Sequence, residues 1–594
     1  MTGAEPPRLT PDLRDATMRW IADDPSAQDR AELQRVLATA MAGSAEAVTE
    51  LADRMAAPLT FGTAGLRGPL RAGPAGMNLT VVRRAAFGIG RYLQESGERG
   101  GTVVIGYDGR RRSAEFAADV AGVLAAQGFS VLLSDGPRPT PVTAFAVRDL
   151  GAAAGLQVTA SHNPPQDNGL KVYLRGGAQL IAPQDARIER AIAAAPAARS
   201  IDAGGPVAGW PESIVPDYLT GAARLARAPH AGADLTVALT PMHGVGGEIA
   251  VQALHLAGFP AVHVVVEQAV PDGAFPTVPF PNPEEPGATD LLLALARQTG
   301  AAVAVALDPD ADRCAIGVPE GDTWRMLTGD ETGALLGDHV LRHLDRTAHP
   351  DPLVATTIVS AELLRAVAAG HGARYDETLT GFKWIVRAGD GAGTGLVFGY
   401  EEALGLCVDP DHVRDKDGIS AAVLACDLVA ELAAAGSSVP DRLDELARAH
   451  GLFVTGPLSI RVTDLSLIAA AMRRLRADPP ADLLGDPVTE STDLLPQTDG
   501  LRWRTGRVRV VVRPSGTEPK LKCYLQVHAD VPDGTDGPGL AALRAAAAGD
   551  LDRLRAQVAQ IIGLCAGSTW PRGSTTPART KRYTFAPPVT FGVS

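Results

Sequence analysis

The chain has 594 residues, of which 45% are hydrophobic and 21% charged, and its formal net charge is −13. This composition is typical of a globular protein, and the length is too great for one hydrophobic core, so roughly four domains are expected. The negative charge disfavours nucleic acid and anionic membranes as partners. An anionic substrate must therefore meet a local cluster of Arg or Lys.

Nothing near the N-terminus predicts export, because residues 1–15 lack both a basic start and an apolar stretch. The longest low-charge stretch, residues 419–436, contains Asp427 and Glu431, which excludes it as a membrane span. The five cysteines are widely spaced and form no C-x-x-C pair, as expected for free thiols in a reducing cytosol. We therefore expect a cytoplasmic protein with neither a membrane nor a nucleic-acid partner, and the sequence does not predict its oligomeric state.

After a helical N-terminal segment, the predicted elements alternate between strands and helices. Residues 1–55 are charged and Ala-rich and predict surface helices. A buried strand at 102–106, a helix that begins at Ser113 as its N-cap, and a strand at 129–133 predict a parallel sheet with a right-handed crossover. The same strand and helix pattern returns over three further stretches: 235–256, 302–307 and 353–436.

The last third of the chain changes character. Strands at 508–512 and 521–527 flank a turn, and a helix at 540–564 follows, which predicts a smaller α+β domain. Residues rich in Thr, Pro and Arg then predict a flexible tail. The expected division is a helical extension over 1–55, four domains over 56–205, 206–322, 323–446 and 447–567, and a tail over 568–594.

A serine stands in a Pro-containing loop after an apolar segment. Residues 159–165 read Thr-Ala-Ser-His-Asn-Pro-Pro and follow the predicted strand at 152–158. The loop predicts an exposed Ser161 hydroxyl at the carboxyl end of a parallel strand, where open sheets bind ligands and where it could accept and return a phosphoryl group. His162 and Lys171 could handle protons or charge there. The alternatives are a simple turn and, weakly without a G-x-S-x-G elbow, a hydrolase nucleophile.

Three carboxylates follow the predicted strand at 302–307. Asp308, Asp310 and Asp312 alternate along the chain, so they point to one side in an extended conformation. Without a cation they would repel one another, and oxygen ligands of this kind suit Mg²⁺. An EF-hand is excluded because its sixth loop position is Arg313 rather than Gly. An aspartyl-phosphate phosphatase and a solvated acidic turn are the alternatives.

A turn between the two C-terminal strands combines groups that bind phosphate. Residues 513–519 read Arg-Pro-Ser-Gly-Thr-Glu-Pro. Gly516 permits a sharp turn of backbone N–H groups, and the side chains of Arg513, Ser515 and Thr517 converge on it. An ordinary hairpin turn is the alternative. Because the chain has neither a Walker A loop nor a G-x-G-x-x-G fingerprint in a βα turn, nucleotide binding is not indicated.

Two further loops are weaker signals by themselves. Glu401 and Glu402 lie in a Gly-flanked loop, where paired carboxylates could accept hydrogen bonds from two sugar hydroxyls, although an exposed acidic turn fits equally well. Residues 61–68 read Phe-Gly-Thr-Ala-Gly-Leu-Arg-Gly, and flexibility around Arg67 suits a loop that reaches an anion. The motifs together supply a nucleophile, a metal site, a hydroxyl acceptor and a phosphate cradle. This inventory indicates phosphoryl transfer between positions of a phosphorylated sugar.

These motifs together resemble the α-D-phosphohexomutase family of phosphoglucomutases and phosphomannomutases. Four loops agree in order between about Phe61 and Tyr524. The segments 274–285, 380–384 and 415–418 are similar to the branch of phosphoglucomutase-2-type enzymes, phosphopentomutases and glucose-1,6-bisphosphate synthases. The resemblance implies an α/β fold with the four-domain phosphohexomutase architecture, in which three αβ domains of similar topology and a smaller α+β C-terminal domain surround a central cleft.

The resemblance also implies a role for each motif residue. Ser161 would be the phosphoserine, and His162, Lys171 and Arg67 would support transfer at that serine. Mg²⁺ would be the cofactor, and a sugar bisphosphate would be the activator that phosphorylates Ser161. The implied metal ligands are Ser161, Asp308, Asp310 and Asp312. The implied substrate contacts are Arg313, Lys383, Glu401, Arg513, Ser515, Gly516 and Thr517.

One departure from the family pattern bears on the substrate. Many hexomutases carry Glu-x-Ser in the sugar loop, where this chain has Glu401, Glu402 and Ala403. Ala403 offers no hydroxyl, and losing such a partner changes discrimination by roughly 1–3 kcal/mol. We expect interconversion of hexose 1-phosphate and hexose 6-phosphate, with glucose or mannose as the sugar, through a bisphosphorylated intermediate. Phosphopentomutase is the alternative, and a glucose-1,6-bisphosphate synthase or a sugar-phosphate phosphatase is more distant.

Overall fold

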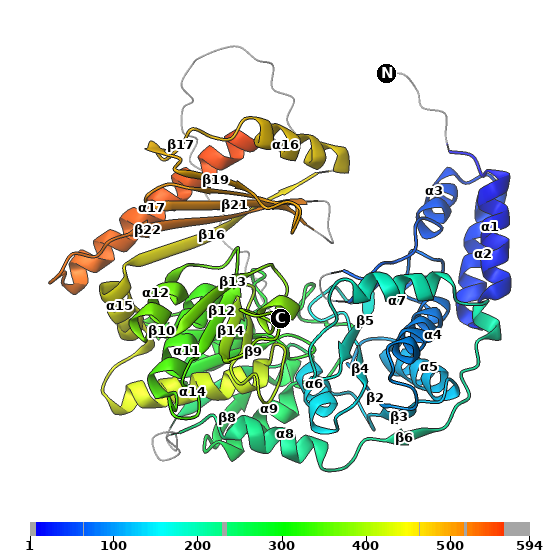
Figure 1. The fold of residues 1–594 in the computed structure, drawn as a ribbon, viewed down its shortest axis with the longest axis horizontal. Coiled ribbons are helices and arrows are strands. Elements are labelled where there is room, and N and C mark those ends of the chain that lie inside the picture. The colour runs from blue at the N-terminus through cyan, green and yellow to red at the C-terminus, as the bar shows by residue number, and fades with distance from the viewer. Residues whose placement is uncertain (1–6, 63–64, 228–234, 463, 516–519, 564–594) are drawn as a thin grey trace, which may run out of the picture.

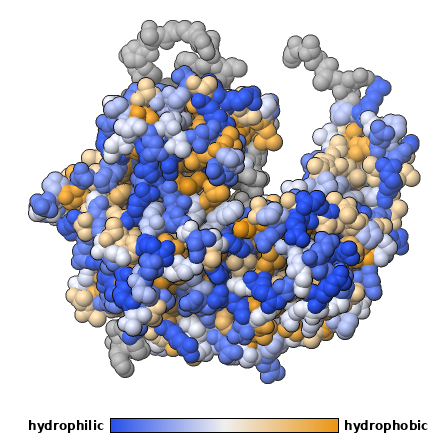
Figure 2. Space-filling model, in the orientation of Figure 1, coloured by the Kyte–Doolittle hydropathy of each residue, from blue (hydrophilic) through white to orange (hydrophobic). Residues whose placement is uncertain are grey.

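The chain folds around four large β-sheets that follow one another along the sequence (Figure 1). The computed structural model describes residues 7–62, 65–227, 235–462, 464–515 and 520–563, and the expected tail at 568–594 lies outside them. Figure 1 shows the fourth sheet above the third, the first sheet to their right, and the N-terminal helices at the right-hand edge. Figure 2 shows a hollow in this face between the block of the fourth sheet and the N-terminal helices.

Three helices precede the first sheet, as the composition predicts. Their bounds are α1 Pro11–Asp23, α2 Ala27–Met41 and α3 Ala45–Arg54. Each begins after a hydroxyl side chain that accepts a backbone hydrogen bond from the first turn, which satisfies an N–H group that the helix itself leaves unpaired. The helices pack on one another through a small apolar core that includes Leu33, Leu37 and Leu51.

A buried ion pair joins this helical extension to the first sheet. Asp29 on α2 is 0% exposed, and its two carboxylate oxygens accept hydrogen bonds from Arg112 Nη1 at 2.6 Å and Nη2 at 3.0 Å. Arg112, with a φ of 66°, precedes α5 (Ser113–Ala126). The prediction that Ser113 caps this helix is wrong, because Ser113 is its first residue and its hydroxyl donates to Asp108 Oδ1 at 2.6 Å.

The first sheet is mixed, with the strand order β1-β5-β4-β2-β3-β6. Strands β2 and β3 run parallel, as the strand–helix–strand segment predicts, whereas β5 pairs antiparallel with both β1 and β4. The strands are β1 Leu66–Pro69, β2 Thr102–Tyr107, β3 Ser130–Leu133, β4 Ala154–Val158, β5 Asp167–Leu174 and β6 Val207–Gly209. The helices besides α5 are α4 Leu79–Glu95, α6 Thr140–Asp149 and α7 Gln184–Ala193.

The second sheet has the strand order β11-β10-β9-β7-β8, and β9 at its centre leads into the aspartate loop. Strand β9 is parallel to β7 and antiparallel to β10. All five residues of β9 are buried, as expected for a central strand covered on both faces. The elements are β7 Thr236–Thr240, β8 Ala261–Val264, β9 Val303–Leu307, β10 Cys314–Glu320, β11 Thr323–Met326, α8 Ile214–Ala223, α9 Gly247–Leu256 and α10 Asp290–Thr299.

The third sheet has the strand order β13-β12-β14-β15, and one continuous apolar core joins it to the second sheet. Helix α14, which is buried along most of its length, lies in that shared core. The strands are β12 Leu353–Thr357, β13 Arg374–Thr378, β14 Leu396–Glu401 and β15 Gly405–Cys407. The helices are α11 Gly329–His343, α12 Leu363–Gly370, α13 Phe382–Ile385, α14 Gly418–Ala434 and α15 Val439–His450.

Within the described part of the chain, no single helix is long and apolar enough to cross a bilayer. Only α14 and α15 taken together, with a bend of 89° at the break between them, reach the required length and composition. The cysteines that the structure describes are buried and free, as expected: Cys314, Cys407, Cys426 and Cys523.

The fourth sheet is fully antiparallel, with the strand order β16-β22-β21-β20-β19, and forms the smaller α+β unit that the sequence predicts. Strands β21 and β22 flank the Arg-Pro-Ser-Gly-Thr turn. The strands are β16 Leu452–Arg461, β19 Glu490–Asp493, β20 Leu501–Arg504, β21 Val508–Pro514 and β22 Lys520–Ala529, with a small ribbon of β17 Asp482–Leu483 and β18 Asp486–Pro487. The helices are α16 Leu465–Ala477 and α17 Gly537–Ile562.

Charged side chains hold the fourth sheet against the third unit. Glu377 in β13 pairs with Arg502 at 2.9 Å and with Arg509 at 3.1 Å. Glu362, just before α12, pairs with Arg504 at 2.6 Å. All three arginines lie on neighbouring strands of the fourth sheet, so the pairs help to fix where β20 and β21 lie relative to the third unit.

Asp29→Asn should loosen the N-terminal helices from the first sheet. The change leaves Arg112 without its buried counter-charge, and breaking a buried pair in this way costs about 3–5 kcal/mol. Limited proteolysis should then cut the linker at 55–62 faster than in the wild type. The matched control is Asp15→Asn, because the Arg14–Asp15 pair is about half exposed, at 45% and 49%. Equal protease resistance of Asp29→Asn and wild type would contradict the role given to the pair.

Candidate active site

The structure brings Ser161 and the three aspartates together. Ser161 follows β4, Asp308 follows β9, and the Ser161 hydroxyl donates to Asp308 Oδ2 at 2.9 Å. The backbone of Ser161 is left-handed, with a φ of 52°, which turns the side chain toward the second sheet's loop. The prediction of an exposed hydroxyl is wrong, because Ser161 is only 1% exposed where the aspartate loop packs against it.

Arg110 holds the serine loop in place, a role that the sequence analysis missed. Its guanidinium donates to four backbone carbonyls, those of Ser161 and Asn163 at 2.5 Å each, Pro164 at 2.8 Å and Asp167 at 3.2 Å. Arg110 is 4% exposed, so this contact is a buried clamp. The only sequence signal was a charged residue between the predicted strand at 102–106 and the helix that follows it.

Positive side chains from two other units neutralise the aspartates. Lys171 Nζ of the first unit lies 2.6 Å from Asp310 Oδ2 and 2.5 Å from Asp312 Oδ2. Lys416 Nζ of the third unit lies 3.2 Å from the same Asp312 oxygen. All four side chains are buried, and an uncompensated charge in such surroundings costs several kcal/mol. The ion pairs therefore tie the first, second and third units together at this point.

The cluster keeps oxygen atoms that suit a divalent cation. Asp310 Oδ1 and Asp312 Oδ1 are buried and have no hydrogen-bond partner among the residues that the structure describes. One carboxylate oxygen from each of Asp308, Asp310 and Asp312 lies within 4.8 Å of the other two. Carboxylate oxygens beside a hydroxyl form the hard donor set that Mg²⁺ prefers. The residues present therefore fit a magnesium ion next to Ser161.

Local charges move the aspartate pKa values in opposite directions. Burial raises the pKa of Asp308 well above its usual value, and the charges of Asp310 and Asp312 raise it further. Burial acts in the same direction on Asp312, but the attraction of Lys171 and Lys416 outweighs it and lowers that pKa. The pKa of Asp310 is also lowered, because Lys171 outweighs burial. Asp310 and Asp312, the two aspartates paired with lysine, thus favour the ionised form that binds a cation.

Two arginines and a histidine complete the charged surroundings. Arg313 donates its backbone N–H to Asp308 Oδ1 at 3.0 Å, and Arg67 Nη1 lies 3.5 Å from Asn163 Oδ1 in the serine loop. Burial lowers the pKa of His162 well below its usual value, and the charges of Arg313 and Arg67 lower it further. His162 is therefore neutral, and its Nδ1 lies 3.2 Å from the serine Oγ.

The two glutamates of the sugar loop point to different partners. Glu401 Oε1 accepts the backbone N–H of Gly381 at 2.9 Å, whereas Glu402 Oε2 accepts the hydroxyl of Ser360 at 3.0 Å. The two neighbouring carboxylates thus have different partners within the protein, and their binding of sugar hydroxyls stays a prediction. Burial, with a further contribution from the charge of Glu401, raises the pKa of Glu402 to about 7. The loop itself is tied to the aspartate cluster, because the Arg313 guanidinium donates to the loop's backbone carbonyl at Ala403.

Lys383 lies beside the first unit. It is half-buried in α13, next to Phe382, whose ring lies 5.4 Å from Lys416 Nζ. Burial lowers the pKa of Lys383, and the charge of Asp185 in α7 opposes that effect. Lys383 thus lies near the contact between the third and first units. It is the residue after Phe382, whose ring lies against Lys416.

The C-terminal turn meets the sugar-loop region of the third unit. Arg513 Nη1 donates to Thr380 Oγ1 at 2.6 Å, and Thr380 immediately precedes the glycine that binds Glu401. At the base of the turn, the Ser515 backbone N–H donates to the Lys520 carbonyl at 2.9 Å. The structure thus places the ends of the predicted phosphate cradle. Outside the described residues lie Gly516 and Thr517.

Models of one protein family match four successive parts of the chain. They describe phosphoglucomutase/phosphomannomutase α/β/α domains I, II and III, over residues 58–199, 216–321 and 328–449, and the C-terminal domain, over 458–533. The chain belongs to the phosphoglucomutase/phosphomannomutase family. This confirms the resemblance drawn from the motifs. The protein is a phosphohexomutase, an enzyme that moves a phosphoryl group within a sugar phosphate.

Relatives of this phosphohexomutase span most of its length. A "Probable phosphomannomutase" of Haemophilus influenzae is 42% identical over 471 residues, which cover 78% of this chain and 95% of that protein. The phosphopentomutase of Homo sapiens is 32% identical over 576 residues, which cover 89% of this chain and 93% of that protein. A crystal structure of a phosphoglucomutase/phosphomannomutase family protein from Burkholderia thailandensis superimposes with a TM-score of 0.63 at 20% identity, over 84% of this chain and 97% of that one. The four-domain fold is thereby confirmed.

Arg110→Lys should lower the turnover of this phosphohexomutase while changing KM little. A single ammonium group cannot span the four carbonyls of the serine loop, and a shift of about 1 Å at a reacting group costs roughly 10²-fold in rate. Steady-state kinetics of the mutase reaction measure both constants. Arg111→Lys is the matched control, since the neighbouring Arg111 is exposed. An Arg110→Lys enzyme with the wild-type kcat would contradict the clamp.

Proposed function

We propose that this phosphohexomutase interconverts hexose 1-phosphates and hexose 6-phosphates, with glucose and mannose phosphates as its substrates, by way of a phosphoserine at Ser161. The observation that carries the proposal is the contact of 2.9 Å between Ser161 Oγ and Asp308 Oδ2, inside a buried cluster where two carboxylate oxygens accept no hydrogen bond from the described residues. A protein that only bound sugar phosphates would gain nothing from a hydroxyl held among three carboxylates. A nucleophile beside a metal site, by contrast, is what phosphoryl transfer requires.

Each half-reaction exchanges one phosphoryl group between Ser161 and a sugar oxygen. The bond between phosphorus and Ser161 Oγ breaks as the free sugar hydroxyl bonds to phosphorus, which leaves a sugar bisphosphate and an unmodified serine. The hydroxyl proton passes through His162 to the serine oxygen, since neutral His162 places Nδ1 3.2 Å from Oγ. The other phosphate of the bisphosphate then returns to Ser161 by the reverse exchange.

Four residues of the cluster would hold the cofactor Mg²⁺, namely Ser161, Asp308, Asp310 and Asp312. When bound, the ion neutralises charge that develops on the transferred group. Lys171 orients Asp310 and Asp312 through their Oδ2 atoms, which leaves both Oδ1 atoms for the ion. Burial disfavours the ionised form of Asp308, and a metal ion is the charge that would restore it.

The phosphate that is not reacting needs a site of its own, because the bisphosphate must stay bound while it turns over. We assign this site to the C-terminal turn, whose Arg513 already reaches Thr380 beside the sugar loop. The phosphate at the reacting end of the sugar would contact Arg67 and Arg313, whose positive charges interact with the aspartates. The remaining substrate contacts that we propose from the sequence are Lys383, Glu401, Ser515, Gly516 and Thr517.

The choice of sugar is supported by the relatives and by the sugar loop. The Haemophilus influenzae relative, at 42% identity, is named for a hexose phosphate, which favours hexoses. The human relative, at 32% identity, is named for a pentose phosphate, and Ala403 without a hydroxyl favours that second candidate. A sugar bisphosphate is the proposed activator. We also propose a cytoplasmic location and the domain limits expected from the sequence.

A side-by-side substrate comparison tests the proposal. We expect glucose 1-phosphate and mannose 1-phosphate to be isomerised with a higher kcat/KM than ribose 1-phosphate, in the presence of Mg²⁺ and a trace of sugar bisphosphate. Ala403→Ser should move the preference further toward hexoses, by roughly 1–3 kcal/mol, because it restores one hydroxyl to the loop. A ribose 1-phosphate preference would make the enzyme a phosphopentomutase. Release of inorganic phosphate without isomerisation would contradict the mutase mechanism.

A further inference from the structure

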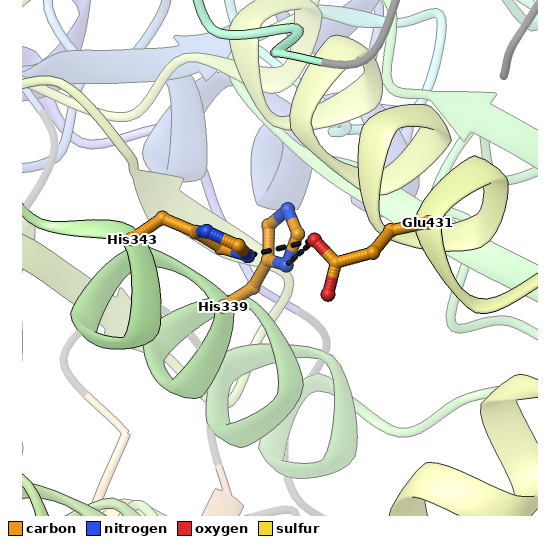
Figure 3. A group of neighbouring side chains, drawn as sticks. All are labelled: His339, His343 and Glu431. Atoms are coloured by element: carbon orange, nitrogen blue, oxygen red, sulfur yellow. Dashed lines mark ion pairs between the residues drawn. The ribbon is translucent and has the colours of Figure 1, made fainter. Parts of the chain in front are cut away.

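Two histidines and a glutamate gather in the third unit, away from the aspartate cluster. His339 and His343 lie one turn apart on α11, and Glu431 on α14 faces both of them (Figure 3). Along α14, Glu431 is about 20 Å from Asp417, the N-cap of that helix, which is next to Lys416 of the aspartate cluster. The proposed mutase reaction therefore makes no use of this group.

The separations suit a small tetrahedral metal ion. Glu431 Oε2 lies 2.7 Å from His343 Nε2 and 3.9 Å from His339 Nδ1, and one ligand atom from each of the three residues lies within 4.8 Å of the other two. Ligands bound tetrahedrally at about 2.0–2.1 Å are about 3.3 Å apart, which lies between the two observed distances. Figure 3 shows both imidazoles directed at the carboxylate. The separations therefore need only modest adjustment for one ion to bind an atom of each residue.

A second carboxylate fixes the tautomer of the buried histidine. His339 is 0% exposed, and its Nε2 lies 2.9 Å from Asp427 Oδ2. A proton on Nε2 leaves the lone pair of Nδ1 directed at Glu431, which is the arrangement of a metal-binding histidine supported by a carboxylate. The side chains of His343 and Glu431 are 33% and 31% exposed, so water can reach a fourth coordination position.

Arg342 supplies positive charge at the same place in this structure. Its Nη1 lies 2.7 Å from Glu431 Oε1, and its Nη2 donates to His339 Nδ1 at 3.2 Å. The second contact agrees with Nδ1 as the acceptor atom of His339. Arg342 Nε also donates to Asp338 Oδ2 at 3.1 Å, so the guanidinium keeps an anchor if it swings away. Arg342 is thus a competitor of any metal ion at this position.

We propose that His339, His343 and Glu431 form a second metal site, which takes a borderline divalent cation such as Zn²⁺ and links α11 to α14. Two imidazoles and one carboxylate favour Zn²⁺ over Mg²⁺, whereas the all-oxygen aspartate cluster favours Mg²⁺. The two sites therefore differ in the ion they select. Because both helices belong to the folded third unit, the bound ion stabilises the fold.

Zinc titration with Mg²⁺ in excess tests the site, because Mg²⁺ then occupies the aspartate cluster. Isothermal titration calorimetry should show one Zn²⁺ bound per chain, and Zn²⁺ should raise the Tm. His343→Ala should weaken Zn²⁺ binding at least tenfold and abolish the Tm rise, while its kcat stays at the wild-type value. The matched control is His263→Ala, because His263 is exposed on β8, and this variant should bind Zn²⁺ like the wild type.

Arg342→Ala separates a metal site from a simple network of ion pairs. With its competitor removed, the site should bind Zn²⁺ about tenfold more tightly, the equivalent of a charged hydrogen bond. Circular dichroism should show that each variant is folded. The proposal is overturned if no Zn²⁺ binds in the presence of Mg²⁺. It is equally overturned if His343→Ala binds Zn²⁺ as tightly as the wild type, or if Arg342→Ala weakens binding.

Discussion

The three buried carboxylates of one loop must be balanced by positive charge. Lysines from two other units of the candidate active site supply it. Lys171 reaches Asp310 and Asp312 from the first sheet, and Lys416 reaches Asp312 from the third unit. Loss of either lysine would leave less positive charge to balance these buried carboxylates, and uncompensated buried charge is costly. These ion pairs act together with the shared apolar core to set the relative positions of three units, and they place Ser161 beside the candidate metal site.

The hydroxyl that we propose as the nucleophile is both buried and held in a fixed position. Ser161 lies in a loop whose backbone carbonyls are bound by Arg110, and its hydroxyl is held by Asp308. Arg110 follows strand β2 and Asp308 follows strand β9, and both strands are buried in their sheets. Precision of this kind matters because phosphoryl transfer depends on positioning and on charge stabilisation more than on chemistry supplied by the protein. The fourth unit is attached separately, through Glu362 and Glu377.

Local sequence patterns predicted the class of reaction. They did not predict contacts between residues that are far apart in the sequence. The alternation of Asp308, Asp310 and Asp312 after an apolar strand indicates a metal loop, because a strand's period of two is a local property. Arg110 could not be assigned, since its partners lie more than 50 residues further along the chain. For the same reason, the sequence could not show that Glu402 turns toward Ser360. The predicted N-cap at Ser113 failed because Ser113 is already the first residue of the helix and its hydroxyl oxygen accepts a hydrogen bond from Asn168 Nδ2 instead.

The most direct test of the account is to find where the enzyme carries its phosphoryl group. The protein would be incubated with Mg²⁺ and glucose 1,6-bisphosphate, digested, and mapped by mass spectrometry, with Ser161→Ala as the control. The account predicts a single phosphoryl group on Ser161, which disappears when a hexose monophosphate is added and is absent from Ser161→Ala. A phosphoryl group on another residue, or full mutase turnover by Ser161→Ala, would contradict the central claim.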